Sequence, residues 1–346
     1  MIGCGTGRVL APVSQRLVEA LVGCGGLQLV GTRQITSLVT GGAGFIGFHL
    51  CRRLLDNGEA VICLDDMTSG SQGNVDELSR HGGFRFVNHD ISNPITVHAD
   101  RIFNLACPAS PPFYEKDPIK TIVTNVMGVR NMLELARSTG AHILQASTSE
   151  VYGDPLVHPQ PETYHGNVAL SGPRACYDEG KRCAEVLMQS YRQMHGTDIR
   201  IARIFNTYGP AMRQDDGRVV SNFIQQALRG DDLTVYGDGS HTRSFCYVDD
   251  LIDGLIRLME LATPCPDPVN LGNPQEISIL AFAQTVINET GSKAKIAFLP
   301  EPENDPRKRC PNISRAKSML GWEPRLTLED GLRATVAYFR KRLETA

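Results

Sequence analysis

A glycine-rich turn between an apolar run and an amphipathic segment constrains the fold of this chain most strongly. Residues 35–40 read ITSLVT, the pattern of a short buried strand, and 41–47 read GGAGFIG immediately afterwards. Apolar residues then recur at Leu50 and Leu54, at the spacing of a helix, and a second strand-like run covers 60–64. This order predicts the strand–turn–helix–strand unit of a dinucleotide-binding sheet.

Each glycine of this turn has a predicted role. Gly41 makes the tight turn, Gly44 lets the backbone approach a pyrophosphate, and Gly47 lets the helix pack closely on the strand. The pyrophosphate is expected at the helix N-terminus, where free N–H groups favour anions. Asp65 ends the second strand, where a carboxylate accepts hydrogen bonds from a ribose 2′-hydroxyl and repels a 2′-phosphate. The pattern therefore favours NAD over NADP.

The alternation of strand and helix patterns continues beyond this unit. We expect strands over 84–87, 101–105 and 142–146 and a long helix over 118–138. Asp90 and the run 105–107 then fall at the C-terminal ends of strands, where doubly wound sheets bind their ligands. The predicted fold class is α/β, with a Rossmann-type doubly wound parallel sheet and a smaller C-terminal substrate-binding lobe.

A tyrosine and a lysine four residues apart carry the candidate chemistry. Tyr177 and Lys181 fall on one face of a predicted helix, and residues 147–150 (STSE) close the fifth strand. We expect the ammonium to lower the pKa of the phenol, so that Tyr177 acts as a general base.

Composition excludes several classes of function. The 346 residues carry 35 basic and 38 acidic side chains, so neither nucleic acid nor a membrane surface is an expected partner. Ten cysteines without a CxxC pair indicate free thiols in a reducing, cytoplasmic setting, and no histidine spacing predicts a metal site. No apolar run is long enough to span a membrane. We expect residues 1–34 to be an N-terminal extension or a targeting peptide, 35–205 a NAD-binding domain, and 206–346 mainly a discontinuous substrate-binding lobe.

Six longer runs carry a resemblance to a known family. They are LACPASPP (105–112), STSEVYGDP (147–155), CYDEGKR (176–182), ARIFNTYGP (202–210), DDGRVVSNF (215–223) and TRSF (242–245). With these runs the chain, from about Ile35 to about Phe339, resembles the extended short-chain dehydrogenase/reductase superfamily. Within that superfamily it is most similar to the UDP-glucuronate decarboxylases.

The resemblance implies a redox-neutral decarboxylation. Oxidation at C4 of UDP-glucuronate by NAD puts a ketone β to the carboxylate, CO₂ leaves, and the returned hydride gives UDP-xylose. Tyr177 takes the 4-hydroxyl proton, Thr148 hydrogen-bonds the same oxygen, and Lys181 holds the nicotinamide ribose. Glu150 and Arg309 resemble the pair that faces the carboxylate and C5, with Glu150 or its water supplying the C5 proton.

The resemblance also implies binding residues and a homodimer through a four-helix bundle of the helices around 118–138 and 175–195. Arg218, Arg243 and either Arg307 or Arg309 are expected to neutralise phosphate charge. The expected cofactor residues are Gly41, Gly44, Phe45, Ile46, Gly47, Asp65, Thr68, Asp90, Ile91, Leu105, Cys107, Thr124, Tyr177, Lys181, Thr207 and Arg218. The expected substrate residues are Pro111, Tyr114, Asn131, Ser149, Glu150, Tyr191, Asn206, Asn222, Tyr236, Arg243 and Arg309.

Three other functions stay open. A UDP-sugar 4-epimerase uses the same Tyr and Lys, and a sugar-nucleotide 4,6-dehydratase prefers an aspartate where this chain has Ser149. A non-catalytic NAD-binding scaffold is the third. The chain also departs from the family pattern in ways that concern substrate affinity, at Val123, His165, Ala211 and Cys310, where lysine, tryptophan, arginine and lysine are common.

Overall fold

Seven parallel strands form the central sheet. The computed structural model describes residues 33–265, 267–300 and 308–344, so nearly all of the expected 1–34 extension lies outside the described residues. From edge to edge the strands are β11 (Val269–Leu271), β6 (Ile199–Ile204), β5 (His142–Thr148), β4 (Arg101–Asn104), β1 (Thr36–Thr40), β2 (Ala60–Asp65) and β3 (Phe84–Asn88). All neighbouring pairs are parallel, which confirms the predicted fold class.

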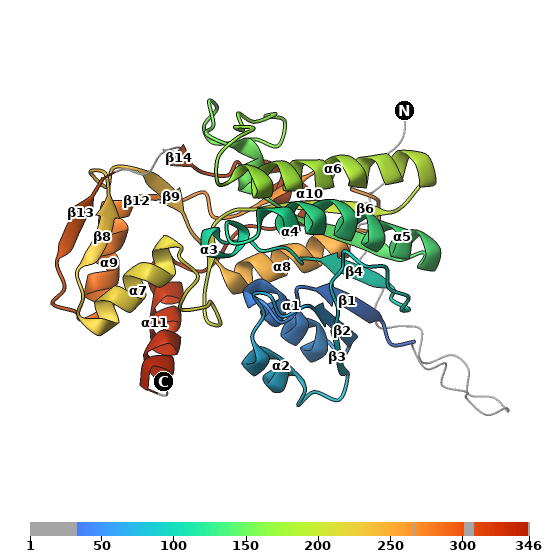
Figure 1. Ribbon diagram of the computed structural model, residues 1–346, viewed down its shortest axis with the longest axis horizontal. Coiled ribbons are helices and arrows are strands. Elements are labelled where there is room, and N and C mark those ends of the chain that lie inside the picture. Colours follow the sequence, from blue (N-terminus) through green and yellow to red (C-terminus); the bar gives the residue numbers. More distant parts are fainter. Residues whose placement is uncertain (1–32, 266, 301–307, 345–346) are drawn as a thin grey trace, which may run out of the picture. The chain divides into compact units, whose positions relative to one another are not determined.

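Helices cover both faces of this sheet (Figure 1). One face carries α4 (Pro118–Val123), α5 (Val129–Thr139) and α6 (Ala175–His195), and the other carries α1 (Phe45–Asp56) and α8 (Val248–Met259), with α2 (Gln72–Leu78) beside α1 and α10 (Ser314–Leu320) beside α8. Side chains alternate between the two faces along each strand: Leu38 packs with Met132 and Met188, whereas Val39 packs in the core with Leu50.

The expected long helix over 118–138 is interrupted. Between α4 and α5 the chain makes one π-helical turn, η1 (Thr124–Gly128). A π turn inserts an extra residue into the helical register, and such turns occur frequently at functional sites. Here the turn carries Thr124, which lines the cavity described below.

The second half of the chain builds the smaller lobe and also returns to the sheet through α8 and β11. In the lobe, α7 (Val219–Arg229), α9 (Ile279–Thr290) and α11 (Leu328–Glu344) pack together beside β8 (Leu233–Tyr236) and β13 (Ile296–Leu299), as Figure 1 shows. A small sheet is formed by β12 (Glu276–Ser278), β9 (Thr242–Ser244) and β14 (Lys308–Arg309), and a two-stranded one by β7 (Thr207–Tyr208) and β10 (Cys246–Tyr247). The hydroxyl of Thr327 accepts the Asp330 N–H and caps α11.

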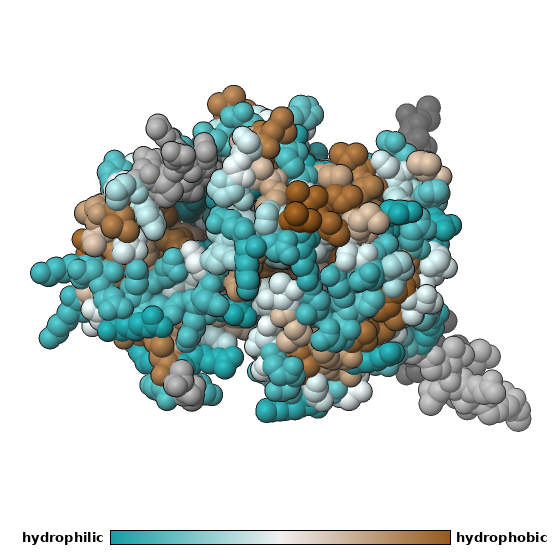
Figure 2. Space-filling model, viewed as in Figure 1, coloured by the Kyte–Doolittle hydropathy of each residue, from teal (hydrophilic) through white to brown (hydrophobic). Residues whose placement is uncertain are grey.

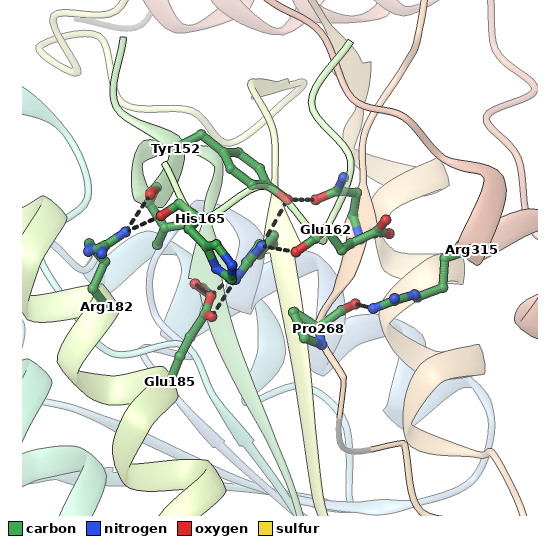
Figure 3. Close-up of polar contacts among 11 residues, drawn as sticks. Tyr152, Glu162, His165, Arg182, Glu185, Pro268 and Arg315 are labelled. Carbon is green, nitrogen blue, oxygen red and sulfur yellow. Dashed lines mark hydrogen bonds and ion pairs between the residues drawn. The ribbon is translucent and has the colours of Figure 1, made fainter. Parts of the chain in front are cut away.

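A buried polar network anchors the chain that follows β5 (Figure 3). After β5 come a short helix, η2 (Ser149–Tyr152), and a long loop. Arg203 on β6 binds the Glu185 carboxylate at 2.7 Å and donates to the Tyr152 hydroxyl at 3.0 Å, which in turn donates to Asn270 on β11 at 2.7 Å. These bonds hold the end of η2 against the sheet. None of the helices in the described part of the chain is long and apolar enough to cross a membrane.

Candidate active site

A cavity of about 220 Å³ lies at the C-terminal ends of the central strands. The parallel arrangement brings the ends of β1, β2, β4, β5 and β6 to one edge, so residues far apart in sequence meet there. The predicted residues that line it are Gly41, Gly44, Phe45, Ile46, Gly47, Asp65, Thr68, Asp90, Ile91, Leu105, Cys107, Thr124, Thr148, Ser149, Glu150, Tyr177, Lys181, Asn206, Thr207 and Arg218.

Eight predicted substrate residues do not line this cavity: Pro111, Tyr114, Asn131, Tyr191, Asn222, Tyr236, Arg243 and Arg309. Asn131 donates to the carbonyls of Ile91 and Ser92 and ties α5 to the loop after β3. The Tyr191 hydroxyl donates to Glu134 at 2.6 Å, which joins α6 to α5 some fourteen residues beyond Tyr177 along the helix. The structure thus gives Asn131 a contact with the loop after β3 and Tyr191 a contact between α6 and α5, both away from the cavity.

Four more of these residues lie outside the cavity, and Arg307 lies outside the described residues. Asn222 donates to the Gly217 carbonyl at 3.0 Å, and Tyr236 is half exposed at the end of β8. Arg243 is buried on β9, where it donates to the Thr242 carbonyl. Pro111 starts the short helix α3 (Pro111–Tyr114). A nucleotide sugar would reach these positions only by extending beyond the cavity.

The glycine turn has the geometry that a dinucleotide requires. Gly41 has a φ of +68°, a left-handed conformation that glycine adopts without strain. A Cβ on Gly47 would overlap the Gly41 carbonyl oxygen, so only glycine allows α1 to approach the turn so closely. The N-terminus of α1 therefore opens into the cavity without side chains in the way, and the residues present fit a bound pyrophosphate.

Asp65 lies where the ribose of a dinucleotide is expected. One carboxylate oxygen accepts the Ala43 N–H at 3.0 Å and the other accepts the Met67 N–H at 2.9 Å. Burial raises the pKa of Asp65, although these two hydrogen bonds oppose the rise. Each oxygen keeps a second lone pair, so the carboxylate can still accept from a 2′-hydroxyl.

We expect Asp65→Ala to weaken NAD binding at least tenfold and to reduce discrimination against NADP, because the change removes both an acceptor and a repelling charge. Dissociation constants for the two cofactors, measured by calorimetry, check this. Asp56→Ala, on the exposed end of α1, is the control. An unchanged NAD constant would mean that the Asp65 carboxylate does not contact the ribose.

Lys120 is a cavity residue that the sequence patterns did not single out. Its ammonium binds Asp66 at 2.6 Å and the Thr68 hydroxyl at 2.9 Å, and it lies 3.6 Å from Asp90. Val123, one turn later on α4, is exposed and does not line the cavity. The sequence signal for Lys120 was its place three residues before position 123, where lysine is common in the family.

Tyr177 is buried beside Lys181 and Thr148. The Thr148 side chain hydrogen-bonds the phenol, and the Lys181 ammonium lies 5.8 Å from the centre of the ring. Lys181 donates to the Ala146 carbonyl at 2.8 Å. Burial, followed by the nearby Cys107 thiol, raises the pKa of Tyr177 well above its ordinary value. The expectation of a lowered pKa is wrong for this arrangement, because the ammonium faces the ring and a backbone carbonyl instead of the hydroxyl.

Glu150 is held between two arginines. Arg309 forms a bidentate ion pair with the carboxylate, one arm of which is 3.0 Å long, and Arg174 binds the same group. Burial alone would raise the pKa of Glu150, but the two guanidinium groups outweigh it and lower the pKa to about 2. Glu150 is therefore a carboxylate at neutral pH. Arg174, which the sequence patterns missed, precedes the helix that carries Tyr177.

Comparison with known proteins agrees with this site. Residues 37–272 match the model of the NAD dependent epimerase/dehydratase family. The chain belongs to this family. The UDP-glucuronic acid decarboxylase 1 of Xenopus tropicalis is 53% identical over 89% of this chain and 72% of its own length, and UDP-glucuronic acid decarboxylase 3 of Arabidopsis thaliana is 54% identical over 88% and 89%. The resemblance inferred from the six runs is confirmed.

Solved structures of epimerase/dehydratase proteins share the fold. The UDP-glucuronic acid 4-epimerase of Bacillus cereus, in complex with UDP-glucuronic acid and NAD, superposes with a TM-score of 0.81 at 30% identity, over 89% of this chain and all of its own. The UDP-glucose 4-epimerase of Thermotoga maritima gives 0.81 at 29%, over the same shares. Membership in this family and the NAD bound in the Bacillus cereus structure make NAD the cofactor of the chain.

Asp178, the residue after Tyr177, is a buried acidic side chain near Glu150. One of its oxygens, Oδ1, is buried and has no hydrogen-bond partner among the described residues. Burial, and then the nearby Glu150 carboxylate, raise the pKa of Asp178 to about 7. The folded protein therefore keeps this proton up to neutral pH, whereas the unfolded chain releases it near pH 3.8. The free energy of unfolding is lowered progressively as the pH rises from about 4 to 7.

We expect Asp178→Asn to remove this pH-dependent penalty. The melting temperature of the variant should match that of the wild type below about pH 4 and exceed it by several degrees at pH 7.5, because three pKa units correspond to at most ~4 kcal/mol. Thermal unfolding followed by circular dichroism between pH 4 and 8 measures the difference. Asp231→Asn, at an exposed aspartate just beyond the C-terminal end of α7, is the control. A difference independent of pH would contradict the raised pKa.

Proposed function

We propose that this protein is an NAD-dependent decarboxylase that converts UDP-glucuronate into UDP-xylose and CO₂. The observation that carries the proposal is the Glu150–Arg309 ion pair. Glu150 follows Thr148 by two residues, and both line the cavity together with Tyr177. This pair is suited to act at a substrate carboxylate, and the neighbouring Tyr177 is suited to accept the proton of a sugar hydroxyl. Relatives that are named UDP-glucuronic acid decarboxylases and are more than 50% identical support the same assignment.

NAD⁺, when bound, takes up the hydride from C4 of the sugar and returns it later, and its positive charge favours the phenolate of a nearby tyrosine. The glycine turn and Asp65 would hold it at the end of β1 and β2. Residues 35–205 then supply most of the cofactor lobe, and 206–346 most of the sugar-nucleotide lobe, with Asn206 and Arg218 at the boundary.

The chain's own residues have distinct tasks in this reaction. Tyr177 receives the 4-hydroxyl proton, and Thr148 orients the oxygen from which it comes. The resulting 4-ketone lies β to the carboxylate, so loss of CO₂ leaves a carbanion that is delocalised as an enolate. A proton must then reach C5. Since Glu150 is ionised, we assign this step to a water molecule that Glu150 orients.

Arg309 has to be assigned a role that its contacts allow. Both of its arms bind Glu150 and the side chain is almost fully buried. Its guanidinium group could bind the substrate carboxylate only by giving up its contact with Glu150. We therefore propose that Arg309 first positions Glu150 as an anion and binds the C6 carboxylate when substrate enters.

Incubation of the purified protein with UDP-glucuronate and NAD, followed by mass spectrometry, tests the proposal. A decarboxylase gives UDP-pentose and loses CO₂, whereas a 4-epimerase gives an isomer of unchanged mass. Because one structural neighbour is named UDP-glucuronic acid 4-epimerase, an isomer of unchanged mass should be separated from the substrate by chromatography. A dehydratase is tested with UDP-glucose or dTDP-glucose. Turnover of UDP-glucuronate to an isomer alone would replace the proposed function by epimerisation.

We also propose a homodimer in a reducing compartment such as the cytoplasm. An apolar face runs along α4, η1 and α6, and Figure 2 shows hydrophobic side chains gathered where these helices lie. Its exposed residues are Ile119, Ile122, Val123, Met127 and Val186. Contiguous exposed apolar surface of this kind is typical of an interface. The eight described cysteines are free thiols, which supports the compartment.

We expect sedimentation to give a dimer at micromolar concentration, and Ile122→Glu to give a monomer, because the charge would be buried without a partner at the bundle. Leu170→Glu, at another strongly exposed apolar side chain, should leave the dimer intact. A monomeric wild type would contradict the four-helix-bundle proposal.

A further inference from the structure

A cluster of ligand-type side chains lies outside the cavity. His158, Glu276 and Cys310 each offer one ligand atom, and these three atoms all lie within 4.8 Å of one another. Across residues 33–265, 267–300 and 308–344, no other group of three or more His, Cys, Asp or Glu side chains has this arrangement. Zinc in proteins takes imidazole, carboxylate and thiolate ligands, and open sites combine three protein ligands with a water in the fourth position.

Main-chain hydrogen bonds join the segments that carry these three side chains. Glu276 begins β12, which pairs with β9, and β14, immediately before Cys310, pairs with the other edge of β9. The segment that carries His158 is joined to the same region, because the Gln160 N–H donates to the Cys310 carbonyl at 2.9 Å and the Asn312 N–H to the Gln160 carbonyl at 3.0 Å. The three ligands are therefore brought together by main-chain hydrogen bonds, independently of any cation.

Outer partners already orient the ligands. Gln160 is fully buried; its Oε1 accepts the Cys310 N–H at 2.9 Å, and its amide nitrogen lies 3.5 Å from His158 Nδ1. The Thr242 hydroxyl donates to one oxygen of Glu276 at 2.7 Å, while the other oxygen faces His158 Nε2 at 2.8 Å. Hydrogen bonds from groups around the ligands hold the ligand atoms of metal sites in place in this way.

We propose that His158, Glu276 and Cys310 form a binding site for a thiophilic divalent cation, with Zn²⁺ the best fit to the donor set. The thiol decides the class of ion, since sulfur ligands select zinc over magnesium or calcium. Cys310 stands where relatives commonly carry a lysine, so the site belongs to this chain's own departure from the family pattern.

Binding has a simple chemical balance. The Cys310 thiol, which donates to the Pro274 carbonyl at 3.3 Å, loses its proton to solvent and forms a Zn–S bond. The ring proton of His158 moves from Nε2, which faces Glu276, to Nδ1, so that Nε2 can bind the cation and the contact with the Gln160 amide nitrogen is given up. No oxidant or reductant is needed. Glu276 contributes the oxygen that faces His158, and His158 contributes Nε2. The cation would tie three distant parts of the chain together, immediately beside Arg309. Since the unfolded chain has no such arrangement, binding should stabilise the fold.

Zinc titration of the full chain tests the site. The protein is dialysed against a chelator and titrated with Zn²⁺ in competition with a chromophoric chelator. We expect the wild type to bind one more zinc ion per chain than Cys310→Ser, in which affinity at this site falls more than ~100-fold, beyond the loss typical of an outer-shell change. Cys183→Ser, which alters an exposed thiol on α6, is the matched control and should behave as the wild type.

Two further readouts keep the test independent of enzyme activity. Co²⁺ bound at the site should give a thiolate-to-metal charge-transfer band that disappears in Cys310→Ser and persists in Cys183→Ser. Zn²⁺ should raise the melting temperature of the wild type and of Cys183→Ser but not that of His158→Gln, whose fold is checked by circular dichroism. Equal zinc stoichiometry and affinity in wild type and Cys310→Ser, or cobalt binding without the thiolate band, would overturn the proposal.

Discussion

Tyr177→Phe should lower turnover of UDP-glucuronate by ~10² to 10⁴-fold while NAD and substrate still bind, because only the group that accepts the 4-hydroxyl proton is removed. The ring itself remains, and so does its stacking on Tyr114, whose ring centre is 5.3 Å away. The fold should therefore be preserved. Steady-state rates measured together with binding constants separate a loss of chemistry from a loss of binding.

Tyr164→Phe is the matched control for this change. Tyr164 is a partly buried tyrosine that stacks on Tyr152 away from the cavity, and its hydroxyl accepts only the Leu156 N–H. We expect its turnover to equal that of the wild type. If Tyr177→Phe kept half or more of the wild-type rate, Tyr177 would have no part in proton transfer.

Glu150→Gln should separate the two halves of the reaction. Hydride transfer from C4 depends on Tyr177, Thr148 and Lys181, so it should still occur when UDP-glucuronate is added. Protonation at C5 and return of the hydride should be slowed, because the anion that orients the water is lost. Reduced nicotinamide would accumulate in stopped-flow absorbance, and a 4-keto pentose would be released and detected by mass spectrometry.

The same variant has a structural cost that must be measured with it. Glu150 is the shared partner of Arg174 and Arg309, so Gln leaves two partly buried cations without their anion. Breaking a buried pair in this way typically costs about 3–5 kcal/mol. Assays therefore belong well below the melting temperature of the variant, with Glu179→Gln as the control. Wild-type formation of UDP-xylose without accumulation of reduced cofactor would remove Glu150 from the mechanism.

Arg309→Ala should fail at an earlier step than Glu150→Gln. Loss of the guanidinium fork leaves Glu150 paired with Arg174 alone and removes the expected partner of the substrate carboxylate, so use of UDP-glucuronate itself should fall and no reduced cofactor should accumulate. Rapid-mixing absorbance distinguishes the two variants. Identical behaviour of both would mean that the pair acts as one structural unit and not at two positions of the sugar.

The cofactor half of the site was predictable because its determinants are local in the sequence. The glycine turn, Asp65 and the strand ends at Asp90 and 105–107 depend on short-range turn and helix geometry, and the order of strand and helix patterns implies that they share one sheet edge. The phenol and ammonium of Tyr177 and Lys181 follow from helix periodicity alone. The sequence by itself therefore determined the fold class and the cofactor, and it supplied the residues that we propose for the C4 chemistry.

Only the tertiary structure decided the electrostatics and the long-range partners. Arg174 meets Glu150 through the loop that precedes α6, and burial, which no periodicity reports, reverses the expected shift in the pKa of Tyr177. Asn131 contacts the loop after β3 and Tyr191 contacts α5, because the rotation of α5 and α6 about their axes is set by the sheet beneath them. Desolvation and contacts between distant segments depend on the assembled fold, and a linear pattern carries neither.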